Sequence, residues 1–379
     1  MTISETTEKR ETLNINMPEA HNQHQKMFAD GLAFLLFQFP SEFSEAKHYM
    51  HFPKTQGFDN EEEYHMGDIF QRSLITDTLI DCNQWMTGQL NPLIDHEIDY
   101  LNNARRKEGI GGWAYFPHLS ELPPDADDLG QIIQINARTG NNEAIAKYCM
   151  PPLYTLLDSN AHNHGGFESW IIPKNNLTTT QQKQLEWAKK AWGTGADTEV
   201  VANLIYALTL LDDNNFEEVI TNGINYIWKK RGIRGTWRST WYFGDYYGTY
   251  VSLRAALTQD ISSSELTVTS EFLLKSQHHD GGWGVNKISS PLHTGLALLS
   301  LLLISNHNRT SIPDNVLNNA LTYLHRTQNQ SGSWLSSPFI KMELGRPKGV
   351  IRAVLEYGSQ TITTNFVVKA LNQLLNTHL

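Results

Sequence analysis

The sequence predicts an all-α fold built from stacked helical hairpins. Five apolar segments have helical spacing, and strand-like alternation is scarce. Each apolar segment follows a more polar helical segment and a turn, so each unit pairs an outer helix with an inner helix. Such units cannot bury their apolar faces alone, and they must stack into an open solenoid or a closed ring. The apolar segments are residues 128–137, 199–211, 249–257, 293–304 and 363–375.

Composition supports one large globular domain. The 379 residues are 40% hydrophobic and include ten tryptophans, which is enough for a sizeable core. The net charge of −10, without any long basic block, argues against nucleic acid as a partner. The two cysteines, Cys82 and Cys149, exclude a disulfide framework and a cysteine-rich zinc site. The polar N-terminus resembles no signal or transit peptide, and we expect a cytoplasmic protein.

The chain divides into three parts by pattern. Residues 1–20 are polar and are expected to form a disordered tail. Residues 21–85 contain apolar stretches with helical spacing and are expected to form an N-terminal helical extension. From residue 86 to residue 379 the helical units repeat, and we expect this part to be the main domain.

A glycine-rich turn that closes on an aromatic residue recurs five times. Glycine permits a sharp reversal after a helix, and the closing aromatic ring can cover the preceding turn. Gln277 and Gln328 stand where an amide can bond the end of a neighbouring helix. We interpret these turns as structural elements that hold neighbouring hairpins together, and not as functional groups. The closing residues are Trp113, Phe167, Trp237, Trp283 and Trp334.

Three carboxylates are crowded into the stretch PPDADDLGQ, directly after the aromatic stretch GGWAYF. They are Asp125, Asp127 and Asp128. One reading is an acidic helix N-terminus, where aspartate caps the helix and complements its dipole. The other is a carboxylic acid that burial and its neighbours keep neutral, so that it can donate a proton. Three adjoining carboxyls would then titrate as a coupled set.

The turns and the aspartates together resemble the class II terpene cyclases, a group that includes squalene-hopene cyclases. FLLKSQHHDGGWG matches their QW repeat, and PDADD after GGWAY matches their Asp-x-Asp-Asp motif. GTWRSTWYFGDYYGTY resembles a third segment of squalene-hopene cyclases. The resemblance covers about residues 86–379, and it implies a single catalytic α/α barrel of five or six hairpins. In that case residues 21–85 are expected to cover the mouth of the barrel.

The resemblance also implies an activity, which is protonation-initiated cyclisation of a linear polyprenyl substrate to a terpene or meroterpenoid. Asp127 would deliver the proton, while Asp125 and Asp128 would orient it. Asn203 stands where the family has a histidine partner of the acid, and Leu129 stands where it often has threonine. Asn203 would then bind the carboxylate that forms, or a water that reprotonates it.

A carbocation needs aromatic walls, because ring faces attract cations without attacking them. The resemblance suggests Tyr115, Trp241 and Tyr247 for this role. Plain core packing is the competing reading for every aromatic residue. Local clustering adds three weaker candidates, which are Tyr242, Tyr246 and Trp192.

The substrate is expected to be a hydrophobic prenyl chain with a head group. Arg346, Lys348 and Arg352 are candidates for binding an anionic head group, although solvation is the competing reading. No metal or redox cofactor is needed for acid-initiated closure, and magnesium enters only if the substrate carries a diphosphate. Residues 28–39 are apolar enough for peripheral membrane contact, and a buried helix explains them equally well.

Other functions compete with the cyclase. A protein prenyltransferase β subunit shares the barrel, and His293 is placed plausibly for its zinc, but neither cysteine lies in the right repeat. Residues 212–217, DDNNFE, faintly resemble a magnesium motif of ionisation-type terpene synthases and are better read as a polar turn. A helical-repeat binding scaffold explains the repeats but gives PDADD no role. Four turn histidines, read as structural rather than metal-binding, are His162, His164, His278 and His279.

Overall fold

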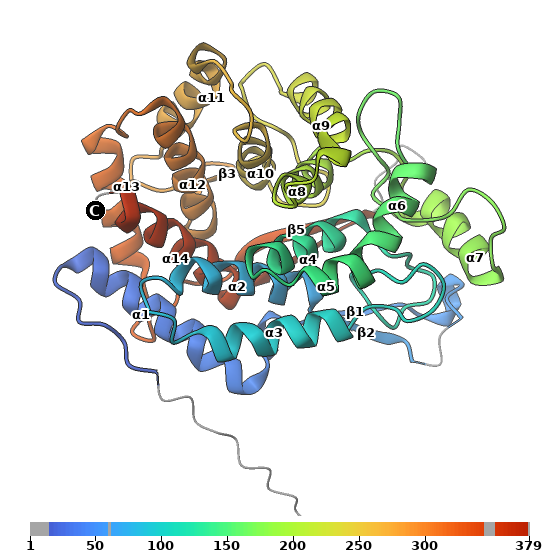
Figure 1. Ribbon diagram of the computed structural model, residues 1–379. Coiled ribbons are helices and arrows are strands. Elements are labelled where there is room, and N and C mark those ends of the chain that lie inside the picture. The colour runs from blue at the N-terminus through green and yellow to red at the C-terminus, as the bar shows by residue number, and fades with distance from the viewer. Residues whose placement is uncertain (1–14, 60–61, 345–352, 378–379) are drawn as a thin grey trace, which may run out of the picture.

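A computed structural model describes residues 15–59, 62–344 and 353–377 of the chain. Within these residues, six inner helices form a closed ring in which each helix packs against the next along the chain and the last packs against the first. Figure 1 shows this ring, and it confirms the predicted α/α barrel. The ring consists of α2 (Ile69–Cys82), α4 (Ala126–Arg138), α8 (Thr198–Thr209), α10 (Tyr246–Ala256), α12 (Pro291–Asn308) and α14 (Gln360–Thr377).

The outer layer consists of the helices that precede the inner ones in sequence. α1 packs against α14, α3 against α2 and α9 against α8, so the outer helices cover the ring from outside. A short helix, α7 (Thr179–Trp187), is inserted before α8. The outer helices are α1 (Gln23–Gln38), α3 (Asn91–Asn103), α5 (Asn142–Ala144), α6 (Met150–Ser159), α9 (Glu217–Lys230), α11 (Ser263–Lys275) and α13 (Asp314–Thr327). Shorter helical turns are η1 (Phe39–Ser41), η2 (Ser44–Ala46), η3 (Lys54–Gln56), η4 (Ile145–Cys149), η5 (Ala188–Trp192) and η6 (Asn214–Phe216).

The glycine-rich turns fasten each hairpin. The indole N–H of Trp283 donates to the carbonyl of Leu273 at 2.7 Å, so the ring closes over the end of α11. The Gln277 amide donates to the carbonyl of Val316 in the next outer helix. Gly281 has a φ of +92°, and a Cβ there would lie 2.2 Å from the Asn319 carbonyl oxygen, so only glycine fits. Gln328 makes the equivalent bond to Met27, which ties the last hairpin to the first.

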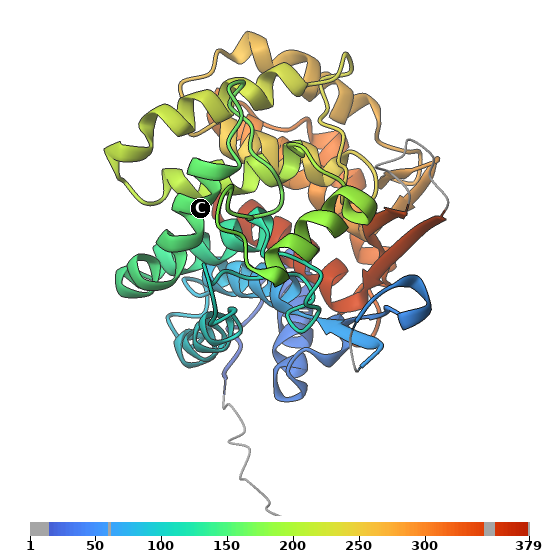
Figure 2. The same cartoon turned by 90° about the vertical axis from the view of Figure 1, so that its right-hand side faces the viewer.

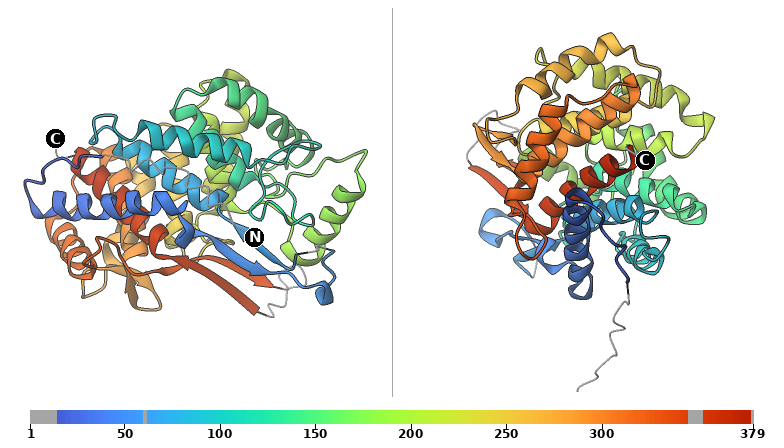
Figure 3. Two further views of the ribbon diagram at one scale, coloured as in Figure 1. Left: turned by 90° about the horizontal axis from the view of Figure 1, so that it is seen from below. Right: turned by 90° about the vertical axis from the view of Figure 1, so that its left-hand side faces the viewer.

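In the described parts of the chain, three antiparallel two-stranded sheets precede inner helices and therefore lie at the end of the barrel where those helices begin. Figures 2 and 3 show the first and the third of these two-stranded sheets beside each other. The third hairpin also pairs with the chain before α10, since Phe243 N–H donates to the Phe339 carbonyl at 2.7 Å. The strands are β1 (His48–His51), β2 (Tyr64–Gly67), β3 (Trp283–Val285), β4 (Ile288–Ser290), β5 (Ser337–Leu344) and β6 (Ala353–Ser359).

The structure differs from the expected division at residue 85. Helix α2 lies in the inner ring between α4 and α14, and α1 packs on α14, so residues 23–82 supply the first hairpin of the barrel. This hairpin contains the β1–β2 sheet in place of a glycine-rich turn, and for that reason the repeat pattern did not reveal it. Part of the expected N-terminal tail is also ordered, since the Asn16 N–H donates to the Gln89 side chain.

The apolar stretch at residues 28–39 lies mostly in α1 and faces the core. Phe28, Leu32 and Leu35 are buried, while Phe37 is 79% exposed. This burial favours the core-helix reading over the membrane-contact reading for most of the stretch. Throughout the described ranges, every helix is too short or too polar to cross a membrane.

Candidate active site

The three crowded aspartates lie at the start of α4. The Asp125 side chain caps this helix by accepting the backbone N–H of Asp128 at 2.8 Å, and Asp127 and Asp128 occupy the first turn. The helix start is fixed from both sides, because Asp125 N–H donates to the Trp113 carbonyl and Ala126 N–H donates to the Ser169 carbonyl, each at 2.8 Å. The helix-cap interpretation therefore explains Asp125. It does not explain why all three side chains are buried.

Asp127 is held by two neutral donors from neighbouring inner elements. The Asn203 amide of α8 donates to its Oδ1 at 2.7 Å, and the Tyr242 hydroxyl donates to its Oδ2 at 2.5 Å. Burial raises the pKa of Asp127 to about 7, although these two hydrogen bonds oppose the shift. Asp127 is therefore an acid that is largely protonated below neutral pH, and its conjugate base already has two donors in place.

Asp128 and Asp125 form a coupled pair beside Asp127. Within the described chain, no N–H or O–H donor reaches either oxygen of Asp128 or Oδ2 of Asp125. Burial, followed by the charges of Asp125 and Asp127, raises the pKa of Asp128 well above its usual range. Burial also raises the pKa of Asp125, to about 6. A protonated Asp128 supplies the donor that the pair otherwise lacks, so one shared proton satisfies both carboxyls.

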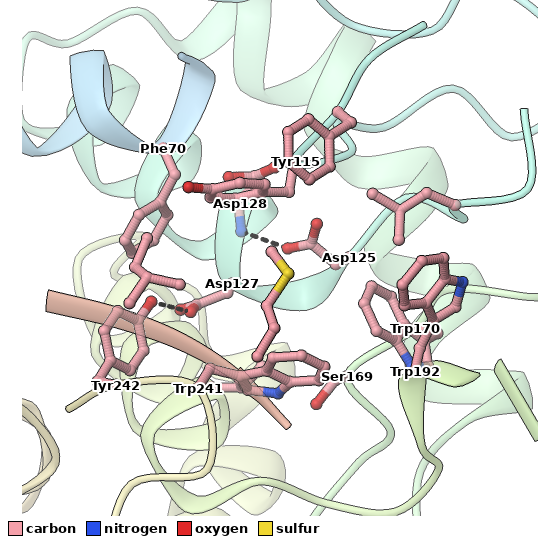
Figure 4. A pocket seen from close by; sticks show the side chains of 15 residues that line it. Phe70, Tyr115, Asp125, Asp127, Asp128, Ser169, Trp170, Trp192, Trp241 and Tyr242 are labelled. Carbon is pink, nitrogen blue, oxygen red and sulfur yellow. Dashed lines mark hydrogen bonds between the residues drawn. The ribbon is translucent and has the colours of Figure 1, made fainter. Parts of the chain in front are cut away.

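A pocket that is partly open to solvent lies beside these carboxyls. Its wall is almost entirely apolar and aromatic, and Figure 4 shows the aspartates on one side with the indole of Trp241 facing them across the hollow. Residues from α2, α4, α8, the segment before α10 and β5 meet here. The lining residues are Phe70, Tyr115, Phe116, Leu122, Asp125, Asp127, Asp128, Ser169, Trp170, Trp192, Val200, Trp241, Tyr242, Ile340 and Met342.

Comparison with known proteins agrees with this geometry. A family model described as the squalene-hopene cyclase C-terminal domain matches residues 73–348. The chain belongs to this family. A probable squalene–hopene cyclase from Sinorhizobium fredii (strain NBRC 101917 / NGR234) is 23% identical over 243 residues, which is 59% of this chain and 36% of that protein. The match thus spans little more than a third of the longer relative.

Solved structures share the fold of this cyclase-family chain. Type II terpene cyclase MstE from Scytonema is 17% identical with a TM-score of 0.67, and the match covers 94% of this chain and 99% of MstE. A variant of MstE is known in complex with geranylgeranyl dihydroxybenzoate as its substrate. A protein from Actinoplanes is 15% identical with a TM-score of 0.67 and covers 93% and 100% of the two chains. At these identities the likeness establishes the fold alone.

Four of the six aromatic residues expected around a cation line the cavity of this cyclase-family chain. They are Tyr115, Trp192, Trp241 and Tyr242. Tyr247 lies behind Tyr242, with ring centroids 4.0 Å apart, and its hydroxyl accepts a hydrogen bond from Asn203 at 3.1 Å. Tyr246 does not line the cavity, and its ring lies 5.4 Å from that of His293. The adjacent Tyr246 and Tyr247 diverge because successive helical positions point about 100° apart.

The three head-group candidates, Arg346, Lys348 and Arg352, lie outside the described residues. Across the rest of the chain, no group of three or more His, Cys, Asp or Glu side chains is placed to hold a metal ion. His293 instead bonds the Phe243 carbonyl and the Ser290 hydroxyl, and burial lowers its pKa to about 4. The pairs of turn histidines lie outside the cavity lining as well.

Several cavity residues were not anticipated. Phe70 comes from α2, and Ile340 and Met342 come from β5, so none of them lies near a recognised motif. Trp170 and Phe116 follow closely on glycine-aromatic turns, and that proximity was a usable signal. The remaining members depend on chain segments that only the folded ring brings together.

A second acidic pair at the start of α8 also escaped the sequence reading. Oε1 of Glu199 accepts the backbone N–H groups of Thr240 and Trp241 at 2.6 and 2.8 Å. Asp197 accepts the Trp241 indole N–H at 2.7 Å and the Ser169 hydroxyl at 2.8 Å. Burial, followed by the charge of Asp197, raises the pKa of Glu199 to about 8. This pair fixes the segment that carries Trp241 and Tyr242 toward the cavity.

Proposed function

We propose that this protein is a class II terpene or meroterpenoid cyclase, which protonates a linear polyprenyl substrate and closes its rings through a carbocation cascade. The observation that carries the proposal is Asp127, a buried carboxyl with a pKa of about 7 that faces an apolar cavity with aromatic walls. Membership of the squalene-hopene cyclase family supports the same chemistry. A barrel that spans residues 23–377 is proposed as one catalytic domain.

The first step is proton transfer from the Asp127 carboxyl to a terminal alkene. The O–H bond breaks, a C–H bond forms, and the alkene becomes a tertiary cation while Asp127 becomes a carboxylate. Tyr242 and Asn203 stabilise this carboxylate without adding a positive charge that would repel the cation. Burial keeps Tyr242 protonated, since its pKa is raised well above the usual range. Both donors are in place before the reaction, so little reorganisation is needed.

The aromatic wall would guide and protect the cation. Trp241, Trp170 and Phe116 line the cavity, and an aromatic face turned toward a desolvated cation is worth about 2 kcal/mol. Within such a wall the chain folds so that each alkene meets the preceding cation in sequence. Tyr115 is fixed from behind, because its hydroxyl accepts a hydrogen bond from Gln71 at 2.6 Å and pairs with His48 at 2.9 Å.

Asp125 and Asp128 are proposed to set the acidity of Asp127. Their shared proton leaves the pair with one negative charge instead of two, and the charge on Asp125 raises the pKa of Asp127. A fully ionised pair would make Asp127 too weak an acid to transfer its proton easily. The pair therefore sets the acidity of Asp127 rather than donating to substrate.

The substrate class is proposed to be a prenyl chain on a polar head group, as in the geranylgeranyl dihydroxybenzoate bound by MstE. Arg346, Lys348 and Arg352 remain proposals for an anionic head group. Magnesium would be required only for a diphosphate head group. Because polyprenyl chains partition into lipid, peripheral membrane contact during substrate loading is part of the same proposal.

The test is incubation of the purified protein with linear prenyl diphosphates, prenyl alcohols and prenylated aromatic acids, each with and without magnesium. We expect cyclic products from at least one class, detected by mass spectrometry and NMR. Asp127→Asn should abolish them while the fold, followed by circular dichroism, is unchanged. Cyclisation that persists in Asp127→Asn would contradict the assignment of the acid, and no cyclisation of any substrate by the wild type would contradict the function.

A further inference from the structure

Among the described residues that line the cavity, Ser169 carries the one aliphatic hydroxyl. Ser169 is buried in the loop between α6 and α7, and its carbonyl accepts the N–H of Ala126 at 2.8 Å. The serine is thereby fixed beside the first turn of α4. Figure 4 shows its side chain next to Trp241, on the other side of the hollow from Asp128.

The Ser169 hydroxyl is oriented by a carboxylate outside the cavity lining. Ser169 donates its proton to Oδ2 of Asp197 at 2.8 Å, and the same oxygen accepts the Trp241 indole N–H at 2.7 Å. A serine hydroxyl has one proton and two lone pairs. Because the proton is directed to Asp197, the lone pairs of Oγ remain to accept a proton.

The other cavity oxygens are less suited to accept a proton. The Tyr242 hydroxyl donates to Asp127, and the Tyr115 hydroxyl already accepts from Gln71. Asp128 is neutral and shares its proton with Asp125. Among the described lining side chains, the competitors are Asp125, which already shares the Asp128 proton, and Asp127 after proton transfer, whose carboxylate is stabilised by two donors.

We infer that Ser169, backed by Asp197, is the proton acceptor that ends the cation cascade, an inference that rests on the proposed cyclase function. A C–H bond next to the cationic carbon breaks, and its electron pair forms the new C=C bond. The proton passes to Ser169 Oγ as the serine's own proton moves to Asp197. Serine thus remains a hydroxyl, Asp197 becomes neutral, and it later releases its proton to solvent.

The position of this pair bears on the product. Ser169 is hydrogen-bonded to the residue that precedes Asp127, so the acceptor lies near the point of first protonation rather than deep along the substrate chain. A cation formed early in the cascade comes within its reach. The expected product is therefore an olefin in which few rings have closed.

The experiment compares wild type with Ser169→Ala and Asp197→Asn on the substrate that the wild type cyclises. Product ratios are measured at matched conversion by gas chromatography and mass spectrometry. Removing the acceptor should lower the share of the wild-type olefin about tenfold, in favour of hydrated or further-cyclised products, because a general base contributes at least that much. Substrate consumption should continue in Ser169→Ala, since Asp127 and the hydrogen bond between Asp197 and Trp241 are untouched.

Ser252→Ala is the matched control. Ser252 is a fully buried serine of the inner helix α10 that does not line the cavity, and its loss should leave the product ratio unchanged. An unchanged ratio in Ser169→Ala, or a wild-type product that is itself an alcohol, overturns the inference and leaves the cyclase function standing. A wild type that consumes no substrate overturns both.

Discussion

The two ends of the helical ring bury carboxyl groups in opposite ways. At the end where the inner helices begin, the aspartates at the start of α4 form no salt bridge within the described chain, Arg106 acts on Asp125 only through longer-range charge attraction, and the pKa values of the aspartates are raised. At the other end, Asp77 of α2 is equally buried, yet its pKa is lowered. Burial opposes ionisation at both ends, so the presence of partners decides the outcome. The end with the salt bridges has a structural role, and the end whose aspartates lack salt bridges can do acid chemistry.

The partnered end is a dense ion network. Lys369 of α14 donates to Asp77 at 2.8 Å, and Arg254 of α10 lies 3.5 Å from the same carboxylate. Arg138, in the last turn of α4, pairs with both Asp77 and Asp81. Three cations thus meet two carboxylates, and the surplus positive charge lies where inner helices end, which suits the negative pole of the helix dipole.

Helix α4 connects the two ends directly. It begins with the aspartates, which form no salt bridge within the described chain. It ends with Arg138, which forms salt bridges with Asp77 and Asp81. The positive pole of its dipole lies beside the aspartates and favours their ionised form. Their raised pKa values therefore reflect burial strong enough to exceed the dipole.

The largest expected effect is at the unpaired end. Asp127→Asn replaces a neutral acid by a neutral amide of the same shape, so it should reduce turnover by about 10³-fold or more and leave the fold intact. Single-turnover product formation and a thermal melt measure the two quantities. The Asp125→Asn variant, which alters the cap rather than the donor, should retain more activity than Asp127→Asn. Equal losses would remove the distinction between the two aspartates.

The paired end should respond in stability instead of catalysis. Asp77→Asn leaves Lys369 and Arg254 buried without their shared carboxylate, and removal of one partner from a buried ion network typically costs about 3–5 kcal/mol. Urea unfolding measures the loss, and activity per folded molecule should be unchanged. Asp30→Asn is the control, because its exposed pair with Lys26 is worth at most about 0.5 kcal/mol. If Asp77→Asn changed the free energy of unfolding only slightly, the ion network would not have the structural role assigned to it.

Acidity should also separate the two ends. Asp127 loses its proton above its pKa of about 7, so cyclisation should fall roughly tenfold for each further pH unit. The Asp77 network does not titrate there, because its carboxylate is already ionised well below that range. A pH–rate profile, with folding followed by fluorescence, tests the separation. A loss of activity that tracks unfolding would assign it to stability rather than to the acid.

The sequence was sufficient for the parts of the molecule that repeat. The turn motifs predicted the ring because each combines a glycine with a closing aromatic residue, and the indole of Trp334 does bond the end of its helix, at Leu324. The first hairpin lacks that motif, so α2 and its Phe70 were not assigned to the ring. Chain order also could not show that β5 would reach the segment before α10 and bring Ile340 and Met342 to the cavity.

The residues of the site also fall into two groups, those that a local sequence pattern indicates and those that only the folded ring reveals. Asp127 stood out because three carboxylates close together are unusual, whereas Glu199 is a lone acid in an apolar helix. Its importance comes from two backbone N–H groups about forty residues away in the chain. Such a contact depends on the closed ring, and local pattern does not encode it.

The smallest expected effect is that of Glu199→Gln. Glu199 is neutral below about pH 8, and glutamine keeps the oxygen that accepts the Thr240 and Trp241 N–H groups, so turnover near pH 6 should be nearly unchanged. Its raised pKa means that the folded protein holds a proton that the unfolded chain releases. Stability from this group is therefore present at low pH and falls as pH rises from the ordinary glutamate range to about 8.

Glutamine does not titrate, so the variant should lose less stability than the wild type between pH 5 and pH 8. Urea unfolding at both pH values measures this difference. Glu199→Ala provides the contrast, because it removes both hydrogen bonds and frees the segment that holds Trp241 and Tyr242. It should slow cyclisation at every pH. If glutamine and alanine behave alike, Glu199 acts by its charge, and the segment before α10 is held in place by its contacts with β5 instead.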